Sequence, residues 1–451
     1  MSNLAPKRDA GLPDIEQLNT MVREVLSLAK QRGATAAEAS VSYGEGLSVS
    51  VRMGEVETLE FNRDRGMGVT VYIGQSKGSA STSDWSKAAL TESVDAACSI
   101  ARYTSKDEFA GLADTDILAR NIPDLDLYHP WDLQAEQAIQ MASACEQAAR
   151  DEDKRITNSD GATVSTYQGL SVYGNSNDFI GGYAGSRHSI SCAVIADDGE
   201  GMQRDYWYDV ARDSNQLLSA ESIGKTAAQR TVRRLNGKRL GTRNAAVLYV
   251  PELARGFIGH FSSAIRGSRL YRKSSFLLDK LDKQIFPDFA NISERPHILQ
   301  GLGSAPFDNE GVQTADKDII NDGILSSYIL NSYSARKLGM QTTGNAGGVH
   351  NMCVEPGQYN FEELVKNMGT GLIVTELMGQ GINYVTGDYS RGASGFWVEG
   401  GEIQYPVDEI TIAGNLSDMF MNIQELGNDV DARGSIRCGS ILVDGMTVAG
   451  E

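Results

Sequence analysis

Alternation of apolar and polar residues divides the first hundred positions into helices and strands. Apolar residues recur at helical spacing over residues 14–32 and Gly33 follows as a stop signal, which predicts a helix. The period then changes to two in three runs separated by glycine-containing turns, at residues 47–51, 59–61 and 69–73. These runs predict an antiparallel meander with one buried face. A second helix is predicted over residues 85–103, with Ser83 or Asp84 available as its N-cap.

The same layout returns after residues 104–130, a connector with scattered Asp and Pro and little periodicity. Three further elements are predicted: a helix at 133–150, strands within 155–210 and a helix at 222–235. The phrase Gly-Leu-Ser-Val occurs at 46–49 and again at 169–172. We therefore predict an N-terminal domain over residues 1–238, with two similar halves at about 14–104 and 133–236.

The remaining chain, residues 239–451, is rich in glycine and in strand-like runs. The sequence Asn321-Asp322-Gly323 lies between two apolar pairs, which is a strong hairpin signal. Helices are predicted near 251–265 and 361–367. The whole pattern predicts an α+β protein: an N-terminal antiparallel sheet region with flanking helices, then a β-rich C-terminal domain.

Composition narrows the classes of function. The net charge of −18 argues against a nucleic-acid partner, because phosphate binding needs a basic face. No apolar run approaches the ~18 residues of a membrane span, and residues 1–14 lack the pattern of a signal peptide. The five cysteines are far apart and odd in number, which argues against a disulfide framework. We expect a cytoplasmic protein with no membrane association.

A zinc peptidase needs two imidazoles on one helical face and a carboxylate nearby to take a proton from the bound water. None of the five histidines is followed by Glu, and no two lie within two helical turns: His129, His188, His260, His297 and His350. A local zinc helix is therefore absent. A site assembled from distant residues, such as His260, His350 and Cys438, stays open as an alternative.

Several longer phrases resemble the PmbA (TldE) branch of the bacterial TldD/PmbA family. The longest is Gly-Asp-Tyr-Ser-Arg-Gly-Ala at 387–393, followed by Gly-Phe-Trp-Val-Glu at 395–399. Other phrases of the same branch stand at 54–57, 101–105, 271–276, 332–339, 368–372 and 375–381. The resemblance covers nearly the whole chain.

The resemblance implies a subunit of a zinc metallopeptidase complex. In this family the TldD kind of subunit carries H-E-x-x-x-H on a helix and a later Cys as third zinc ligand, and the PmbA kind is its companion. The heterodimer degrades flexible or unfolded peptides, including an antitoxin and a microcin precursor. For this chain the resemblance implies a TldD-like partner that holds the zinc, peptide substrates and, without the partner, a possible homodimer.

When the zinc motif is carried onto this chain, its catalytic position and its second histidine position fall on residues that cannot perform these roles. Glu252 stands where the first histidine would be, Leu253 replaces the catalytic glutamate, and Phe257 replaces the second histidine. Cys438 keeps the position of the third ligand, and His260 lies on a neighbouring face of the helix, so these two remain only weak candidates for metal. We expect no catalytic residue, no metal and no cofactor in this chain, because Leu and Phe offer no lone pair.

The apolar residues Leu253, Phe257 and Phe261 are spaced by four, so they form one stripe that we expect to pack into the core. The leading hypothesis is a subunit that completes the substrate cleft or stabilises an active partner. Two alternatives stay open. One is a self-sufficient peptidase with an unconventional site, and the other is a peptide-binding scaffold without proteolysis.

Overall fold

The computed structural model describes residues 12–450. Most of the segment 1–14, in which the sequence showed no signal-peptide pattern, lies outside the described residues. The chain forms two compact units. The N-terminal unit contains residues 12–195, 205–228 and 305–314, and the C-terminal unit contains 196–204, 229–304 and 315–450. The sequence predicted two consecutive domains, 1–238 and 239–451. It did not predict that residues 196–204 belong to the C-terminal unit and residues 305–314 to the N-terminal unit. Within the described residues, no helix has both the length and the apolar run needed to span a bilayer.

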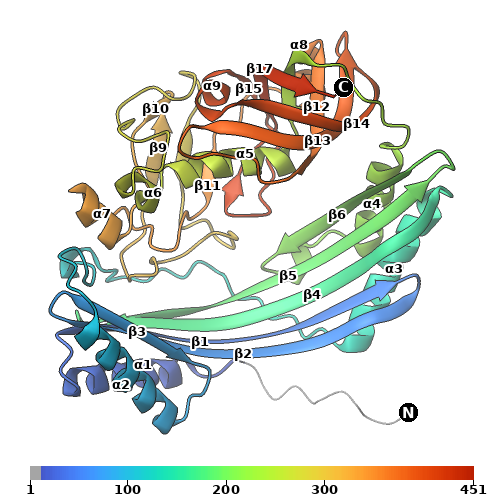
Figure 1. Ribbon diagram of the computed structural model, residues 1–451. Coiled ribbons are helices and arrows are strands. Elements are labelled where there is room, and N and C mark those ends of the chain that lie inside the picture. The colour runs from blue at the N-terminus through green and yellow to red at the C-terminus, as the bar shows by residue number, and fades with distance from the viewer. Residues whose placement is uncertain (1–11, 451) are drawn as a thin grey trace. The chain divides into compact units, whose positions relative to one another are not determined.

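The N-terminal unit is built on one antiparallel sheet with the order β3-β2-β1-β4-β5-β6. Its long strands form a continuous curved surface in Figure 1. The strands are β1 (Ala36–Arg52), β2 (Glu55–Ile73), β3 (Ser76–Thr82), β4 (Ile156–Asn175), β5 (Phe179–Asp197) and β6 (Met202–Ala211). Because β1 pairs with β4 along most of its length, the first meander and the second join at the centre of the sheet.

Helices bury the apolar residues that alternate along these strands. In Figure 1, α1 and α2 lie beside one end of the sheet and α3 lies near the other. The helices are α1 (Ile15–Gln31), α2 (Lys87–Tyr103), α3 (Ala135–Glu152) and α4 (Ala220–Val232), with short 3-10 turns at Thr115–Ile117 and Ser214–Gln216. Val22 of α1 and Val94 of α2 share one core with Val41 of β1. The predicted helices therefore all form, within a few residues of the expected ends.

Two predictions in the first meander were wrong. Residues 59–61 and 69–73 belong to a single strand, β2, instead of two strands joined by a turn. Gly66 and Gly68 lie inside that strand opposite Ser42 and Ser40, so these glycines give the chain room beside a neighbouring strand and do not turn it. The N-cap of α2 is Ser86, whose hydroxyl accepts from the amide of Ala89, and not Ser83 or Asp84.

Two other glycines allow helices to approach closely. A Cβ on Gly78 of β3 would stand 2.1 Å from the carbonyl oxygen of Ala97 in α2. A Cβ on Gly224 of α4 would stand 2.0 Å from the carbonyl oxygen of Cys145 in α3. Any side chain at either position would push the two elements apart.

A short segment of the later sequence, residues 305–314, completes the N-terminal unit. Phe307 packs edge-on against Phe179 of β5, with ring centroids 5.2 Å apart, and Val312 joins the same apolar cluster. The backbone of Val312 also forms a bridge with Leu118 in the connector. The connector is therefore held by a segment nearly two hundred residues away in the sequence.

The C-terminal unit contains two sheets of mixed direction, ordered β10-β9-β8-β11-β16 and β14-β13-β12-β7-β17-β15. The first has β8 (Ile292–Glu294), β9 (Lys317–Asn321), β10 (Ile324–Leu325), β11 (Met352–Val354) and β16 (Ile436–Arg437). The second has β7 (Arg243–Tyr249), β12 (Gly371–Met378), β13 (Asp388–Glu399), β14 (Glu402–Asn415), β15 (Ile423–Leu426) and β17 (Ile441–Ala449). The α+β class and the β-rich C-terminal region are confirmed.

Five helices accompany these sheets: α5 (Pro251–Ala264), α6 (Gly267–Tyr271), α7 (Ser332–Leu338), α8 (Phe361–Met368) and α9 (Leu416–Met421). The hairpin predicted at residues 321–323 is confirmed between β9 and β10. Asp322 and Gly323 both have positive φ, at 48° and 77°, as a type I′ turn requires.

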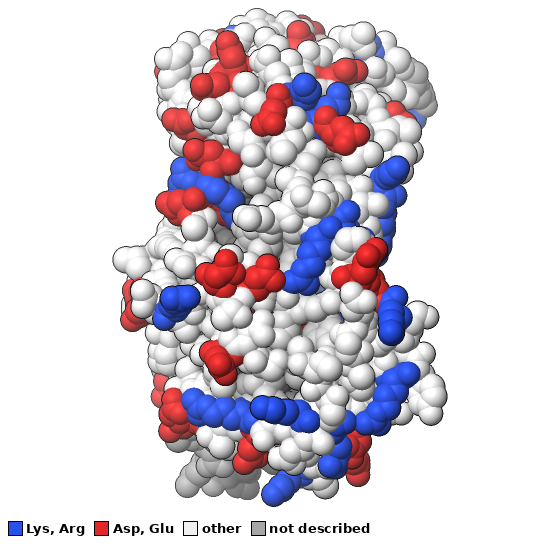
Figure 2. All heavy atoms as spheres, turned by 90° about the vertical axis from the view of Figure 1, so that its left-hand side faces the viewer, with Lys and Arg blue, Asp and Glu red and all other residues white. Residues whose placement is uncertain are grey.

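Charges of both signs are interspersed on the face shown in Figure 2, without a broad basic surface. The five cysteines are all unpaired, and four of them are buried.

One edge of the N-terminal sheet is open. Strand β3 pairs with β2 only over residues 67–73, so residues 55–66 of β2 pair with β1 alone. Several apolar side chains on this segment are exposed, with Leu59 at 51% and Phe61 at 37%. The same segment carries six charged residues: Glu55, Glu57, Glu60, Arg63, Asp64 and Arg65.

A buried carboxylate fixes the turn between β1 and β2. Glu146 of α3 is only 1% exposed and accepts hydrogen bonds from the amides of Met53 and Gly54, at 2.7 and 2.8 Å. Glu146→Ala leaves both amides without this acceptor. We expect it to lower the free energy of unfolding by about 2–3 kcal/mol in urea denaturation. Gln140→Ala, at an exposed position on the same helix, should change it by less than about 0.5 kcal/mol, and equal effects would contradict this role.

Candidate functional site

The helix onto which the zinc motif was carried is α5, and local sequence explains its position. It follows β7 directly, with Val250 as N-cap and Pro251 in the first turn, where the missing amide costs no hydrogen bond. Its buried face carries Ala254, Phe257, Ile258 and Phe261. The helix therefore lies with its middle against the core of the C-terminal unit.

Phe257, the predicted replacement of the second zinc histidine, is packed among aromatic rings. Its ring stacks on Tyr249 of β7, with centroids 5.3 Å apart and an angle of 8° between the planes. Its ring centroid also lies 5.0 Å from that of Phe420 in α9. Leu253 lies at the edge of the same core and Phe261 is fully buried in it, so the packing predicted for this stripe is confirmed.

Glu252, the predicted replacement of the first histidine, forms an ion pair. Its Oε1 lies 3.2 Å from Nη1 of Arg230, and both side chains are about 15% exposed or less. The pair connects α5 to the end of α4 in the C-terminal unit. The carboxylate is therefore engaged by a guanidinium.

Cys438 is likewise shielded from solvent and hydrogen-bonded within the protein. Its side chain is buried, and its thiol donates to the carbonyl oxygen of Gly439 at 3.0 Å. Burial raises the pKa of the Cys438 thiol, and the charge of Asp429 raises it further, so the thiol is protonated at neutral pH.

An arginine of α5 stands close to this cysteine. Nη2 of Arg255 lies 3.4 Å from a carboxylate oxygen of Asp431, whose backbone bridges to Cys438. Burial raises the pKa of Asp431, but hydrogen bonds from Arg433 and the charge of Arg255 hold it below its ordinary value. Asp431 is thus an ionised partner of two guanidinium groups. The guanidinium of Arg255 would also repel a divalent cation at this position.

These residues do not fit a zinc ion. Of the four positions carried over from the zinc motif, Leu253 and Phe257 have no donor atom, Glu252 is paired with arginine, and the thiol of Cys438 is protonated and hydrogen-bonded. Across residues 12–450, no group of three His, Cys, Asp or Glu side chains is arranged to hold a metal ion.

The distant histidines do not form a cluster with Cys438. The amide of His350 donates to Glu294, a buried carboxylate that also pairs with Lys317 at 2.9 Å. His260 instead belongs to an aromatic group beside α5. His260, His350 and Cys438 are therefore held in separate surroundings.

His260 lies between two tyrosines. Its Nδ1 is 3.0 Å from the hydroxyl of Tyr384, and its ring meets the ring of Tyr389 edge-on at 5.9 Å. Burial and, to a smaller extent, the nearby charge of Arg391 lower the pKa of His260 to about 4. The imidazole is therefore neutral at pH 7. Sequence reasoning quoted Tyr389 and Arg391 within a family phrase but assigned them no role.

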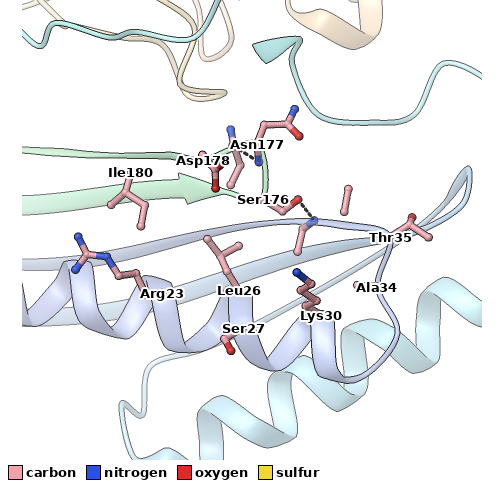
Figure 3. Close-up of a pocket in the computed structure, with 13 residues that line it drawn as sticks. Arg23, Leu26, Ser27, Lys30, Ala34, Thr35, Ser176, Asn177, Asp178 and Ile180 are labelled. Atoms are coloured by element: carbon pink, nitrogen blue, oxygen red, sulfur yellow. Dashed lines mark hydrogen bonds between the residues drawn. The ribbon is translucent and has the colours of Figure 1, made fainter.

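A cavity of about 780 Å³ lies in the N-terminal unit, between α1 and the turn from β4 to β5 (Figure 3). Arg23 and Lys30 lie on its helical side. The hydroxyl of Ser176 accepts from the amide of Ala37, so the turn is fastened to β1. The polar groups of this wall therefore serve the fold, and none of the predicted site residues lines the cavity.

Phe257→Ala should destabilise the protein because it opens a space in the aromatic core. We expect a loss of about 3–5 kcal/mol in the free energy of unfolding, measured by urea denaturation. Phe289→Ala is the matched control, since Phe289 is 47% exposed, and it should cost less than about 1 kcal/mol. A small loss for Phe257→Ala would show that the helix position is not structural.

His260 should make stability depend on pH. Its folded pKa of about 4 lies below the ordinary 6.5, so the unfolded chain binds a proton between these values and the folded chain does not. Stability from this group is complete above pH 6.5 and falls by about 2–3 kcal/mol as the pH approaches 4. His260→Gln should flatten the pH profile of unfolding across this window, whereas His297→Gln, at an exposed position, should not.

Comparison with known proteins identifies the family. Three family models match in order: PmbA/TldA metallopeptidase domain 1 over residues 37–101, the central domain over 128–235 and the C-terminal domain over 242–450. Metalloprotease PmbA of Escherichia coli O157:H7 is 50% identical over 443 residues, covering 98% of both chains. A PmbA homologue of Haemophilus influenzae is 49% identical, covering 96% of both.

Solved structures agree with this assignment. A crystal structure from Bacteroides thetaiotaomicron superposes with a TM-score of 0.92 at 28% identity, covering 97% of this chain and 99% of the other. TldE from Thermococcus kodakarensis has the same fold, with a TM-score of 0.80 at 18% identity over 95% of this chain and all of the other. The chain therefore belongs to the PmbA/TldD metallopeptidase family, in its PmbA (TldE) branch.

Proposed function

We propose that this chain is the non-catalytic subunit of a zinc peptidase complex, paired with a TldD-like subunit that holds the metal. The observation that carries the proposal is the use of the peptidase helix as core. Leu253 and Phe257, in place of the glutamate and the second histidine, pack into the aromatic cluster around Tyr249. A position filled in this way offers neither a metal ligand nor a general base.

The role we assign to the chain is to complete the substrate cleft and to stabilise the active partner. The partner would be a homologous subunit, since related chains commonly pair through equivalent surfaces. Substrates would be flexible or unfolded peptides, with degradation of an antitoxin and processing of a microcin precursor as examples from the family. We place the complex in the cytoplasm, and without its partner the chain would form a homodimer.

The experiment measures zinc and peptidase activity together. The purified chain, its Cys438→Ala variant, a purified TldD-like subunit and the mixture are each analysed for zinc per chain and for cleavage of an unstructured peptide. We expect no stoichiometric zinc and no cleavage for this chain or its variant. The mixture should cleave the peptide, and a chelator should abolish that activity.

Other outcomes point to the alternatives. Stoichiometric zinc in the isolated chain that is lost in Cys438→Ala, together with cleavage that a chelator stops, would establish a self-sufficient peptidase. Failure to associate with the TldD-like subunit at micromolar concentration, with peptide binding retained, would favour a scaffold without proteolysis.

A further inference from the structure

Three side chains from separate segments of the C-terminal unit are in contact beside α5, and a fourth, Arg391, is near enough for its charge to act on His260. His260 comes from α5, Arg269 from α6, Tyr384 from the loop before β13 and Arg391 from β13 itself. The hydroxyl of Tyr384 bonds to Nδ1 of His260 at 3.0 Å, and the guanidinium of Arg269 lies 3.9 Å from the centroid of the Tyr384 ring. All four side chains are partly exposed, so a ligand can reach them from solvent.

The two guanidinium groups of this cluster lack an acidic partner. Arg391 donates to the carbonyl oxygen of Leu377 at 3.4 Å and to the hydroxyl of Tyr389, and its buried Nε has no hydrogen-bond partner. Neither Arg391 nor Arg269 forms an ion pair with any residue in the described part of the chain, 12–450. A buried guanidinium nitrogen without an acceptor is costly, and such groups in native proteins call for an explanation.

Three other arginines of the same unit do have acidic partners. Arg230 pairs with Glu252, Arg255 pairs with Asp431, and Arg234 pairs with Glu376. The chain has 59 acidic and 41 basic residues, so acidic partners are plentiful. The guanidinium groups of Arg269 and Arg391 have no such acid beside them, and one of them has a buried Nε without an acceptor, so an anion from outside could be accommodated there.

The remaining groups of the cluster suit a carboxylate. Neutral His260 adds no competing charge, and its bond to Tyr384 fixes that hydroxyl near the open side of the ring. Guanidinium groups bind carboxylates through two parallel N–H···O bonds, and such charge-assisted bonds are stronger than neutral ones.

We propose that Arg391 and Arg269, positioned by Tyr384 and His260, form a subsite that binds a carboxylate of a peptide. The inference rests on the proposed function in taking a peptide as the ligand. The carboxylate has two possible sources, the C-terminal carboxylate of the peptide and the side chain of Asp or Glu. The subsite would give this subunit a part in choosing substrates that is separate from the zinc chemistry of the proposed partner.

The test measures peptide binding by the isolated full-length chain, without metal and without the partner. Three fluorescein-labelled, unstructured decapeptides differ only in their carboxylates. The first has a free C-terminus and one internal Glu, the second is amidated at the C-terminus, and the third has Gln in place of Glu. Fluorescence anisotropy gives a Kd for each. We expect the loss of one of the two carboxylates to weaken binding at least tenfold, which also identifies the source.

Arginine variants test whether the preference for one carboxylate depends on this cluster. Arg391→Gln and Arg269→Gln should each abolish the difference between the peptides, and Arg391→Lys should restore part of it. Arg243→Gln is the matched control, since Arg243 is an exposed arginine of the same unit whose guanidinium lies 5.0 Å from the centroid of the Trp397 ring. Circular dichroism and thermal melting of each variant check the fold. If Arg391→Gln fails to fold, Arg269→Gln carries the test.

Three results would overturn the inference. They are equal affinity of the unmodified chain for all three peptides, an unchanged preference in the folded glutamine variants, and no binding of any peptide. Each result is independent of zinc content and of cleavage. A chain that lacks the preference yet assembles with a TldD-like subunit would overturn this inference alone, and a chain that cleaves peptides by itself would overturn only the proposed function.

Discussion

The contact between Phe257 and Tyr249 determines much of the C-terminal unit. A ring of α5 stacks flat on a ring of β7, and Phe420 of α9 closes the same cluster. In a zinc peptidase, this helix and a distant cysteine are tied together by a metal ion. Here apolar packing and aromatic stacking hold the helix, so its position requires no ligand.

Charge is arranged around α5 in two different ways. On one side, Glu252 and Arg255 are neutralised by partners from α4 and from the segment before β16. On the side of His260, the guanidinium groups of Arg269 and Arg391 have no such partner in the described residues. The first arrangement stabilises the fold. The second keeps a positive potential at the surface, and a fixed positive potential selects for negatively charged ligands.

The sequence alone predicted elements whose signals are local. Pro251 and the apolar stripe through Phe257 placed α5 to within a residue at its end, and Asn321-Asp322-Gly323 placed a hairpin. Glycine misled the prediction at Gly66 and Gly68, because the same residue that permits a turn also permits close approach inside a strand.

Features that depend on distant pairs could not be predicted. Nothing near Arg255 in the sequence points to Asp431, and nothing in residues 305–314 shows that they complete the N-terminal unit. The candidate site also depends on contacts between residues that are distant in the sequence. The family resemblance pointed to Glu252, Leu253 and Phe257, but the lack of an acidic partner for Arg391 and of an acceptor for its Nε is visible only in the structure.

The open edge of β2 has a consequence for handling the protein. A strand with free amide and carbonyl groups and exposed Leu59 and Phe61 can template pairing with another chain. The charges interspersed along this strand act as gatekeepers, because bringing two such edges together would crowd like charges. Colloidal stability should therefore be more sensitive to neutralising Glu57 or Glu60 than the fold itself is. High salt, which screens these charges, should favour aggregation through this edge.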